Sequence, residues 1–319
     1  MPDGRAITPG AEDEPALPLS FNRAPAPDLD PWVGRFMVAQ SAAGPGGRNA
    51  GLLCNDTSYL RTAIDAHWTV ETVDGNVEIF DRSFLCGQNR ESMRLHYTGP
   101  VRVAGIMLRP GVMHALWGIE DAGMVQRVCL MGDLGMDEDG LNALYRPGIA
   151  SVEWVEALEN WMRKAVTRLG AREPDLLSRQ FEVAAFADPN RQMTDFAEEH
   201  GVTLRTLQRV VKRDFGMTPK QVMRRARVLD LASRLCGVAD EDEDDILLRF
   251  FDQSHRIREF QAFFKMTPQV FRRNRHGLLT LSLEIRQARR LEMLDRIAPG
   301  AVRPWMRKPF VPAVSRTAS

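Results

Sequence analysis

Basic and amide side chains at helical spacing are the residues of this sequence with the most distinct chemistry. Between Leu204 and Phe215, apolar residues recur every three or four positions and therefore share one face of a helix. The opposite face carries long hydrogen-bond donors: Arg205, Thr206, Gln208, Arg209, Lys212 and Arg213. Such donors contact phosphate oxygens, and arginine and glutamine also pair with guanine and adenine in the major groove. The pattern predicts a helix that binds double-stranded DNA.

A short helix and a tight turn precede this segment and would position it. The sequence MTDFAEEH begins at Met193 with its own apolar face, and it ends at Gly201, a residue that adopts positive φ without strain. The hydroxyl of Thr203 can then cap the next helix. This order of helix, three-residue turn and helix predicts a helix-turn-helix unit.

A second copy of this arrangement occupies residues 250–268. Its helix is expected to begin near Asp252 and to present three polar side chains outward: Ser254, His255 and Arg258. Between the copies, Pro219 to Cys236 predicts a linking helix, which would be about 25 Å long at 1.5 Å per residue. One chain could then contact two adjacent major-groove segments, which lie about 34 Å apart.

The residues of both copies resemble a known family. The sequences FAEEHGVTLRTLQRVVKRDFGMTPKQVMRRARVLDLASRL and DQSHRIREFQAFFKMTPQVFRR are similar to the two halves of the DNA-binding region of AraC/XylS bacterial transcription regulators. The resemblance covers Met193 to Arg273 and implies a tandem helix-turn-helix domain. It implies base-facing positions for Arg205, Gln208, Arg209, Ser254, His255 and Arg258. Contacts to phosphate or solvent are expected for Lys212, Arg213, Arg224 and Arg225.

The second copy departs from the family pattern at three positions. Arg249 and Lys265 stand where the family usually has glycine, and Arg256 stands where a buried apolar residue is common. These departures make the second copy less secure as a base-contacting unit. A protein-interaction module in which it no longer meets DNA is an open alternative.

The N-terminal half has the texture of a β domain. Short β-type runs broken by glycine and proline begin at Trp32, and Asp74-Gly75 is a typical two-residue hairpin turn. They favour a small antiparallel barrel or sandwich, followed by an amphipathic helix over Ser151 to Leu169 that packs on its own domain or on a second chain. The family resemblance implies a cupin-like effector or dimerisation domain here. The expected fold class is therefore α+β with two domains, the second being all-α.

Composition divides the chain into four segments. Residues 1–31 are rich in proline, alanine and acidic residues, and we expect a disordered leader. Residues 32–173 would form the β-rich domain with its helix, and residues 174–276 the DNA-binding domain. Residues 277–319 contain another amphipathic helix and a tail rich in proline and arginine. This helix could dock on either domain or contact phosphate.

Charge follows the same division, although the net charge of the chain is zero. There are 17 basic and 25 acidic residues before Phe186, and 25 basic and 17 acidic residues from there on. Nine Arg and Lys residues but only two acidic ones lie between Leu204 and Arg234. A positive field therefore surrounds the predicted DNA-binding unit. The acidic run from Asp240 to Asp245 should point away from a duplex.

Residues for other chemistry are scattered. His67, His96 and His114 are isolated, the four cysteines form no C-x-x-C pair, and neither G-x-S-x-G nor a phosphate-binding loop occurs. We therefore assign no catalytic, cofactor-binding or metal-binding residue and do not expect an enzyme. With no signal peptide and no apolar run of bilayer length, a cytoplasmic protein without a membrane partner is expected.

Together these patterns predict a sequence-specific DNA-binding transcription regulator. Its expected partners are double-stranded DNA and a second copy of the chain, and further candidates are a small-molecule effector and RNA polymerase. The alternative is a β-barrel that binds small molecules or acts as a metalloenzyme, with the helical half as a structural or protein-interaction module.

Overall fold

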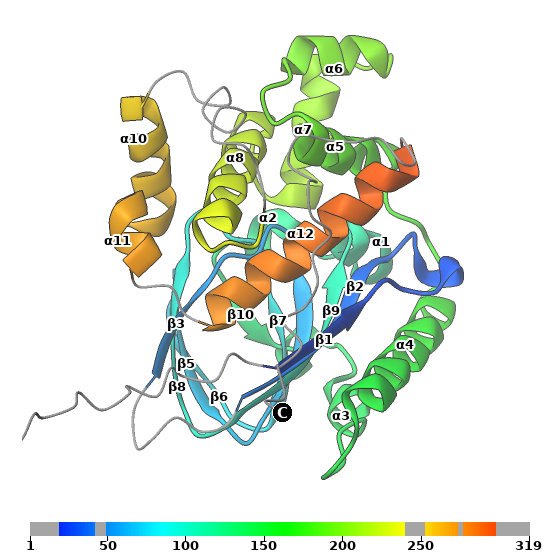
Figure 1. Ribbon diagram of the computed structural model, residues 1–319. Coiled ribbons are helices and arrows are strands. Elements are labelled where there is room, and N and C mark those ends of the chain that lie inside the picture. The colour runs from blue at the N-terminus through cyan, green and yellow to red at the C-terminus, as the bar shows by residue number, and fades with distance from the viewer. Residues whose placement is uncertain (1–18, 42–48, 240–252, 274–276, 298–319) are drawn as a thin grey trace, which may run out of the picture.

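A computed structural model describes residues 19–41, 49–239, 253–273 and 277–297 (Figure 1). Within these ranges the N-terminal half consists of antiparallel strands with a few helices, and the C-terminal half consists of helices. The predicted α+β class with two domains is therefore confirmed. The acidic run from Asp240 to Asp245 and the tail after Ile297 lie outside the described residues.

The N-terminal half contains two antiparallel sheets that share an apolar core. The six-stranded sheet has the order β1 (Leu19–Arg23), β2 (Val33–Ser41), β9 (Val101–Leu108), β4 (Tyr59–Ile64), β7 (Arg82–Cys86) and β10 (Val128–Leu130). The four-stranded sheet has the order β3 (Asn49–Leu53), β8 (Met93–Thr98), β5 (His67–Thr72) and β6 (Gly75–Ile79). The predicted hairpin at Asp74-Gly75 joins β5 to β6. The architecture is a sandwich of two sheets.

The six-stranded sheet is covered on both faces, which explains why β4 is buried along its whole length. On the inner face, Tyr59 and Ala63 face the core between the sheets. On the outer face, Leu60 lies in a second core with the apolar side of α4 (Ser151–Arg168), including Trp154 and Leu158. The long amphipathic helix therefore packs on its own domain.

The expectation of a disordered leader is wrong for residues 19–31. Leu19–Arg23 forms β1 and pairs along its length with β2, and Leu29 in the 3-10 helix η1 (Pro27–Leu29) is buried. Arg23 also forms an ion pair with Glu159 of α4 at 2.6 Å. Composition does not predict this ordered segment, because its stability comes from strand pairing with β2 and from an ion pair with a distant carboxylate rather than from its few apolar residues.

The C-terminal half begins with α5 (Leu176–Ala187), whose Phe181 meets Phe196 and Phe215 edge-on with ring centroids 5.4 Å apart in each pair. The elements after α5 are α6 (Met193–Glu199), α7 (Leu204–Phe215), α8 (Pro219–Leu235), α10 (Gln253–Phe264) and α11 (Pro268–Arg273). The start of α8 is fixed by a capping box between Thr218 and Gln221.

The last described helix, α12 (Gly277–Ile297), lies between the sandwich and the helical half (Figure 1, orange). Leu281 and Ile285 belong to the core between the two sheets. Leu283 belongs to the core that α8 and α10 share. The helix therefore docks on both domains at once.

Arginines of α12 are buried at this junction with carboxylates from both sides. Arg286 forms ion pairs with Asp56 of the β3–β4 loop at 3.0 Å and with Asp230 of α8 at 2.6 Å. Arg289 pairs with Glu182 of α5 at 2.6 Å. Because these guanidinium groups are inside the protein, they are not available to phosphate.

The C-terminal end of α7 also rests on the β domain, against α1 (Val112–Trp117) and α2 (Asp121–Met124). Gly216 has a φ of 64°, and a Cβ atom built on it would lie 2.2 Å from a methyl group of Val125 and 2.8 Å from the Asp121 carbonyl oxygen. Only glycine fits both the backbone angle and the space. The Asp121 side chain accepts a hydrogen bond from Ser58 at 2.5 Å, and burial raises its pKa to about 7.

Replacing Asp230 with alanine should strongly destabilise the protein, because it removes a carboxylate that pairs with the buried guanidinium groups of both Arg286 and Arg290. We expect Asp230→Ala to lower the free energy of unfolding by about 3–5 kcal/mol, measured by urea unfolding with circular dichroism. The control is Glu153→Ala, which breaks an exposed pair with Arg146 and should cost less than about 1 kcal/mol. Equal losses would contradict the role of the buried cluster.

The contact at Gly216 can be separated from its backbone strain by a matched glycine. Gly201 has nearly the same φ, 62°, but has open space around it. Gly201→Ala should therefore cost only the left-handed strain of about 1–2 kcal/mol. Gly216→Ala should cost about 1–3 kcal/mol more, because the methyl group overpacks the junction. Tryptophan fluorescence during urea unfolding measures both, and a smaller loss for Gly216→Ala would rule out the contact.

Candidate nucleic-acid interface

The first helix-turn-helix unit consists of α6, a turn and α7, as the sequence predicts. Gly201 adopts positive φ in the turn, and the Thr203 hydroxyl accepts the Thr206 N–H at 3.1 Å to cap α7. The apolar face of α7 is buried through Leu207 and Val211 in a core with α5, α6 and α8. This face holds the helix firmly, so the opposite face has a defined orientation.

Four of the six predicted side chains of α7 are exposed together on that opposite face: Arg205, Gln208, Arg209 and Lys212. Among the described residues, no carboxylate forms an ion pair with Arg205 or Arg209. Lys212 donates to the Gly216 carbonyl oxygen at 3.3 Å, at the C-terminal end of the helix. The result is a row of donors available to an external partner.

The structure gives different environments to Arg213 and Thr206. Arg213 is partly buried and binds Asp214 at 2.5 Å and Asp175, at the start of α5, at 3.2 Å. The hydrogen bond to Asp214 raises the pKa of Arg213 above its usual value. Thr206 is half-buried, with its hydroxyl 3.0 Å from that of Thr203. Both residues hold α7 in place rather than standing in the exposed row.

The expectation that Arg225 contacts phosphate or solvent is wrong. Its side chain is buried against the β domain and donates to the Asp56 carbonyl oxygen at 2.6 Å. Burial lowers the pKa of this guanidinium to about 10. In contrast, the neighbouring Arg224 is exposed, as expected.

The described part of the second unit is centred on α10. Ser254 and Arg258 are exposed, whereas Phe260 and Phe264 are buried. The side chain of His255 lies outside the described residues, as do Arg249 and the side chain of Arg256. The exposed pair follows the same outward pattern as the donors of α7.

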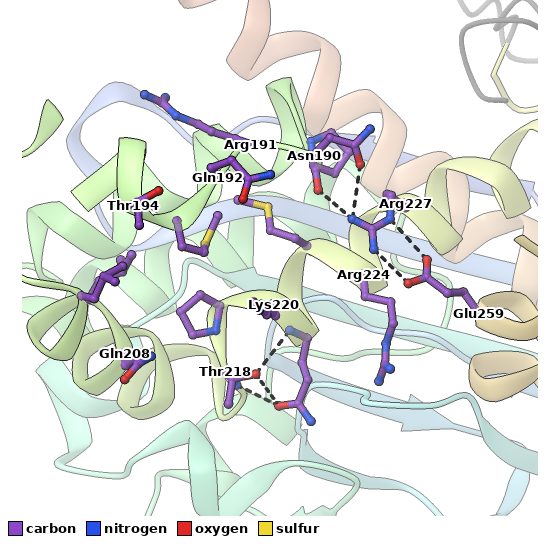
Figure 2. A pocket seen from close by; sticks show the side chains of 17 residues that line it. Asn190, Arg191, Gln192, Thr194, Gln208, Thr218, Lys220, Arg224, Arg227 and Glu259 are labelled. Atoms are coloured by element: carbon purple, nitrogen blue, oxygen red, sulfur yellow. Dashed lines mark hydrogen bonds and ion pairs between the residues drawn. The ribbon is translucent and has the colours of Figure 1, made fainter. Parts of the chain in front are cut away.

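A groove of about 810 Å³ is lined by α6, α7 and α8 of the first unit and its linking helix, and Glu259 of α10 lies at its edge (Figure 2). Gln208 lies on one side of it, and Arg227 lies on the other, where its guanidinium binds Glu259 of α10 at 2.9 Å. Lys220 and Arg224 line the groove and, among the described residues, form no ion pair. The N-terminal end of α8 also opens here. The cations and the positive end of the α8 dipole make the groove suited to a phosphate chain.

Lys220 is a candidate contact that the periodicity of the first unit does not indicate. Its signal in the sequence is the four-residue spacing from Arg224, which places both cations on the solvent side of α8. The net charge of residues 204–234 indicates that this part of the chain has a basic surface, but it does not indicate where that surface lies. The position follows only once α8 is placed beside α7.

The described part of the chain contains neither a cluster of metal-binding side chains nor a membrane-spanning helix. It contains no group of three or more His, Cys, Asp or Glu side chains that could hold a metal ion. His67 and His96 each lie beside a single glutamate, at 3.2 Å and 3.5 Å. None of the helices described is both long and apolar enough to span a bilayer.

Comparison with known families matches the two halves separately. A helix-turn-helix domain (HTH_18) matches residues 196–274, and a domain of unknown function (DUF6597) matches residues 22–129. Among solved structures, ToxT from Vibrio cholerae is similar with 12% identity and a TM-score of 0.43, covering 71% of this chain and 97% of that chain. A likeness of this size does not assign a fold.

Curated relatives match about a quarter of the chain. The HTH-type transcriptional activator RhaS of Citrobacter koseri is 34% identical over 85 residues, which are 26% of this chain and 30% of that protein. RhaS of Escherichia coli is 33% identical over 85 residues, with the same coverage. This chain thus spans about a third of the length of these relatives. The helix-turn-helix region of this protein is of the AraC/XylS type, and the resemblance read from its sequence is confirmed there.

Proposed function

We propose that this chain is a sequence-specific DNA-binding transcription regulator that contacts two adjacent major-groove segments through α7 and α10. The observation that best supports it is the exposed row of Arg205, Gln208 and Arg209 on a helix whose other face is buried. Guanidinium groups without a carboxylate partner are ready for bidentate bonds to guanine or phosphate. A glutamine between them adds a donor and an acceptor for adenine.

The proposed contacts fall into two classes. Arg205, Gln208 and Arg209 on α7, with Ser254, His255 and Arg258 on α10, contact base edges and determine sequence preference. Lys212, Lys220 and Arg224 contact phosphates, and the groove lined by α6, α7 and α8 follows one stretch of the DNA backbone. In this proposal Thr206 and Arg213 support α7 and do not touch DNA.

The β domain is proposed to regulate this binding. It buries the C-terminal end of α7 and Arg225 of α8 at a polar junction, so its state bears directly on the DNA-binding half. A small-molecule effector is its proposed ligand. A second copy of the chain and RNA polymerase are the partners that the family resemblance implies.

Selection of bound duplexes from random DNA, followed by mobility shifts, tests the proposal. The expected result is one enriched sequence with two separated elements, bound at least about a thousandfold tighter than random DNA. Purified protein that enriches no sequence would contradict the proposal. Metal analysis of the same sample distinguishes the metalloenzyme alternative, which requires a stoichiometric ion.

Arg209→Ala should weaken binding to the selected sequence by about 1–3 kcal/mol and relax preference at one base position, because it removes a bidentate base contact. Quantitative mobility shifts on selected and random duplexes measure the difference. Arg168→Ala on α4, where the arginine pairs with Asp137, is the control and should change neither affinity. Equal losses on both duplexes would show that Arg209 contacts phosphate instead.

Lys220→Ala should weaken binding to all duplexes alike, because its proposed partner is a phosphate. The slope of log affinity against log salt concentration should become shallower by about one. Titrations at several salt concentrations measure this slope. Arg23→Ala, where the arginine pairs with Glu159 of α4, serves as a charge-matched control with an unchanged slope. A changed base preference after Lys220→Ala would contradict the assignment.

A further inference from the structure

The loop that joins β7 to β8, residues 87–92, contacts α7 and α8. The side-chain amide of Gln88 donates to the carbonyl oxygen of Asp214, near the C-terminal end of α7, at 3.1 Å. The guanidinium of Arg225 on α8 donates to the Gln88 side-chain oxygen at 3.2 Å and to the Asn89 carbonyl oxygen at 3.3 Å. Gln88 and Asn89 are fully buried, so water cannot replace these bonds.

The same loop holds the C-terminal end of α10. The Ser92 N–H donates to the Phe263 carbonyl oxygen at 2.9 Å, and Lys265, just after the helix, forms an ion pair with Glu91. Asp214 and Phe263 are each the last residue but one of their helices. One loop of the β domain therefore contacts equivalent ends of both helices that are proposed to contact bases.

Buried amide groups keep this loop rigid. Asn89 and Asn55 exchange two hydrogen bonds, from the Asn89 N–H to the Asn55 carbonyl oxygen at 2.8 Å and from the Asn55 N–H to the Asn89 side chain at 2.7 Å. The Gln126 side-chain oxygen accepts the Arg90 N–H at 2.9 Å and the Asn89 amide at 3.2 Å. A fully bonded buried network has few alternative arrangements.

The network also reaches the interior of the sandwich. The Arg61 guanidinium, stacked 4.4 Å from the Tyr59 ring centroid, donates to the Asn55 side-chain oxygen at 2.9 Å. Gly105 on the neighbouring strand leaves room for it, since a Cβ there would lie 3.2 Å from the Arg61 side chain. Hydrogen bonds thus run without a break from the β core to the loop.

We propose that residues 87–92 are a positioning element that fixes the distance and orientation between α7 and α10, and with them the spacing of DNA elements that the chain prefers. The inference rests on the proposed function. The helix α8 contacts both units, and the loop supplies a second attachment for each. Because α7 and α10 are each attached both to α8 and to the loop, neither helix can shift along a DNA major groove without breaking hydrogen bonds to the loop.

Duplexes with one or two base pairs inserted between the selected elements test the proposal. The wild-type chain should lose affinity on insertion, and Gln88→Ala should reduce this discrimination about fivefold or more, a typical size of coupling between sites. Gln40→Ala is the matched control, because Gln40 bonds to Ser151 at 3.4 Å within the β domain. Unchanged discrimination by a folded Gln88→Ala protein would overturn the proposal.

A second variant acts at an exposed position and leaves the buried network intact. Glu91→Lys opposes Lys265 with a like charge and should reduce the same discrimination. The combination of Glu91→Lys with Lys265→Glu restores an ion pair and should restore the discrimination. If the single variant has no effect, or the reversed pair fails to restore it, the loop does not position α10.

Hydrogen exchange without DNA separates this inference from the proposed function. Relative to Gln40→Ala, Gln88→Ala should accelerate amide exchange at the C-terminal ends of both α7 and α10. If the protein selects no DNA but this acceleration is observed, the proposed function is contradicted, while the role of the loop in holding the two helices still stands. Unchanged exchange at either helix would overturn the positioning role itself.

Discussion

The buried guanidinium of Arg286 is the interaction on which the arrangement of the two halves depends. A charge inside a protein must be paired, and two carboxylates that pair with this one come from different halves, Asp56 from the sandwich and Asp230 from α8. Separating the halves would therefore break a buried ion pair. The neighbouring pair of Arg289 and Glu182 adds the same constraint on α5. These buried ion pairs hold the two halves of the chain together.

The helix α7 faces two environments along its length. Its N-terminal part presents Arg205 and Arg209 to solvent, whereas its C-terminal end buries Asp214 and places Gly216 against the Asp121 carbonyl group. A change in the β domain therefore reaches the helix proposed to contact bases by direct contact. In a protein whose domains are joined only by a flexible linker, a change in one domain would not alter the orientation of a helix in the other domain.

Local signals predicted the elements because they act over a few residues. Gly201 and Thr203 place the turn and the start of α7, and helical periodicity identifies its buried face. Partners distant in the sequence could not be predicted. Arg213, Arg225 and Arg286 have the spacing of solvent-exposed cations on basic helices, yet each meets acceptors brought there by the tertiary fold. The sequence therefore predicts a basic surface on this half of the chain, but it does not show which of the cations the tertiary fold buries.

The late position of α12 in the sequence has a consequence for biosynthesis. Leu281 and Ile285 complete a core whose last strand ends at Leu130. At about 5–20 residues per second, a ribosome needs roughly 8 to 30 s to add the intervening segment. Throughout that interval the nascent sandwich lacks part of its interior and exposes apolar surface. This core can therefore be completed only after α12 has been synthesised.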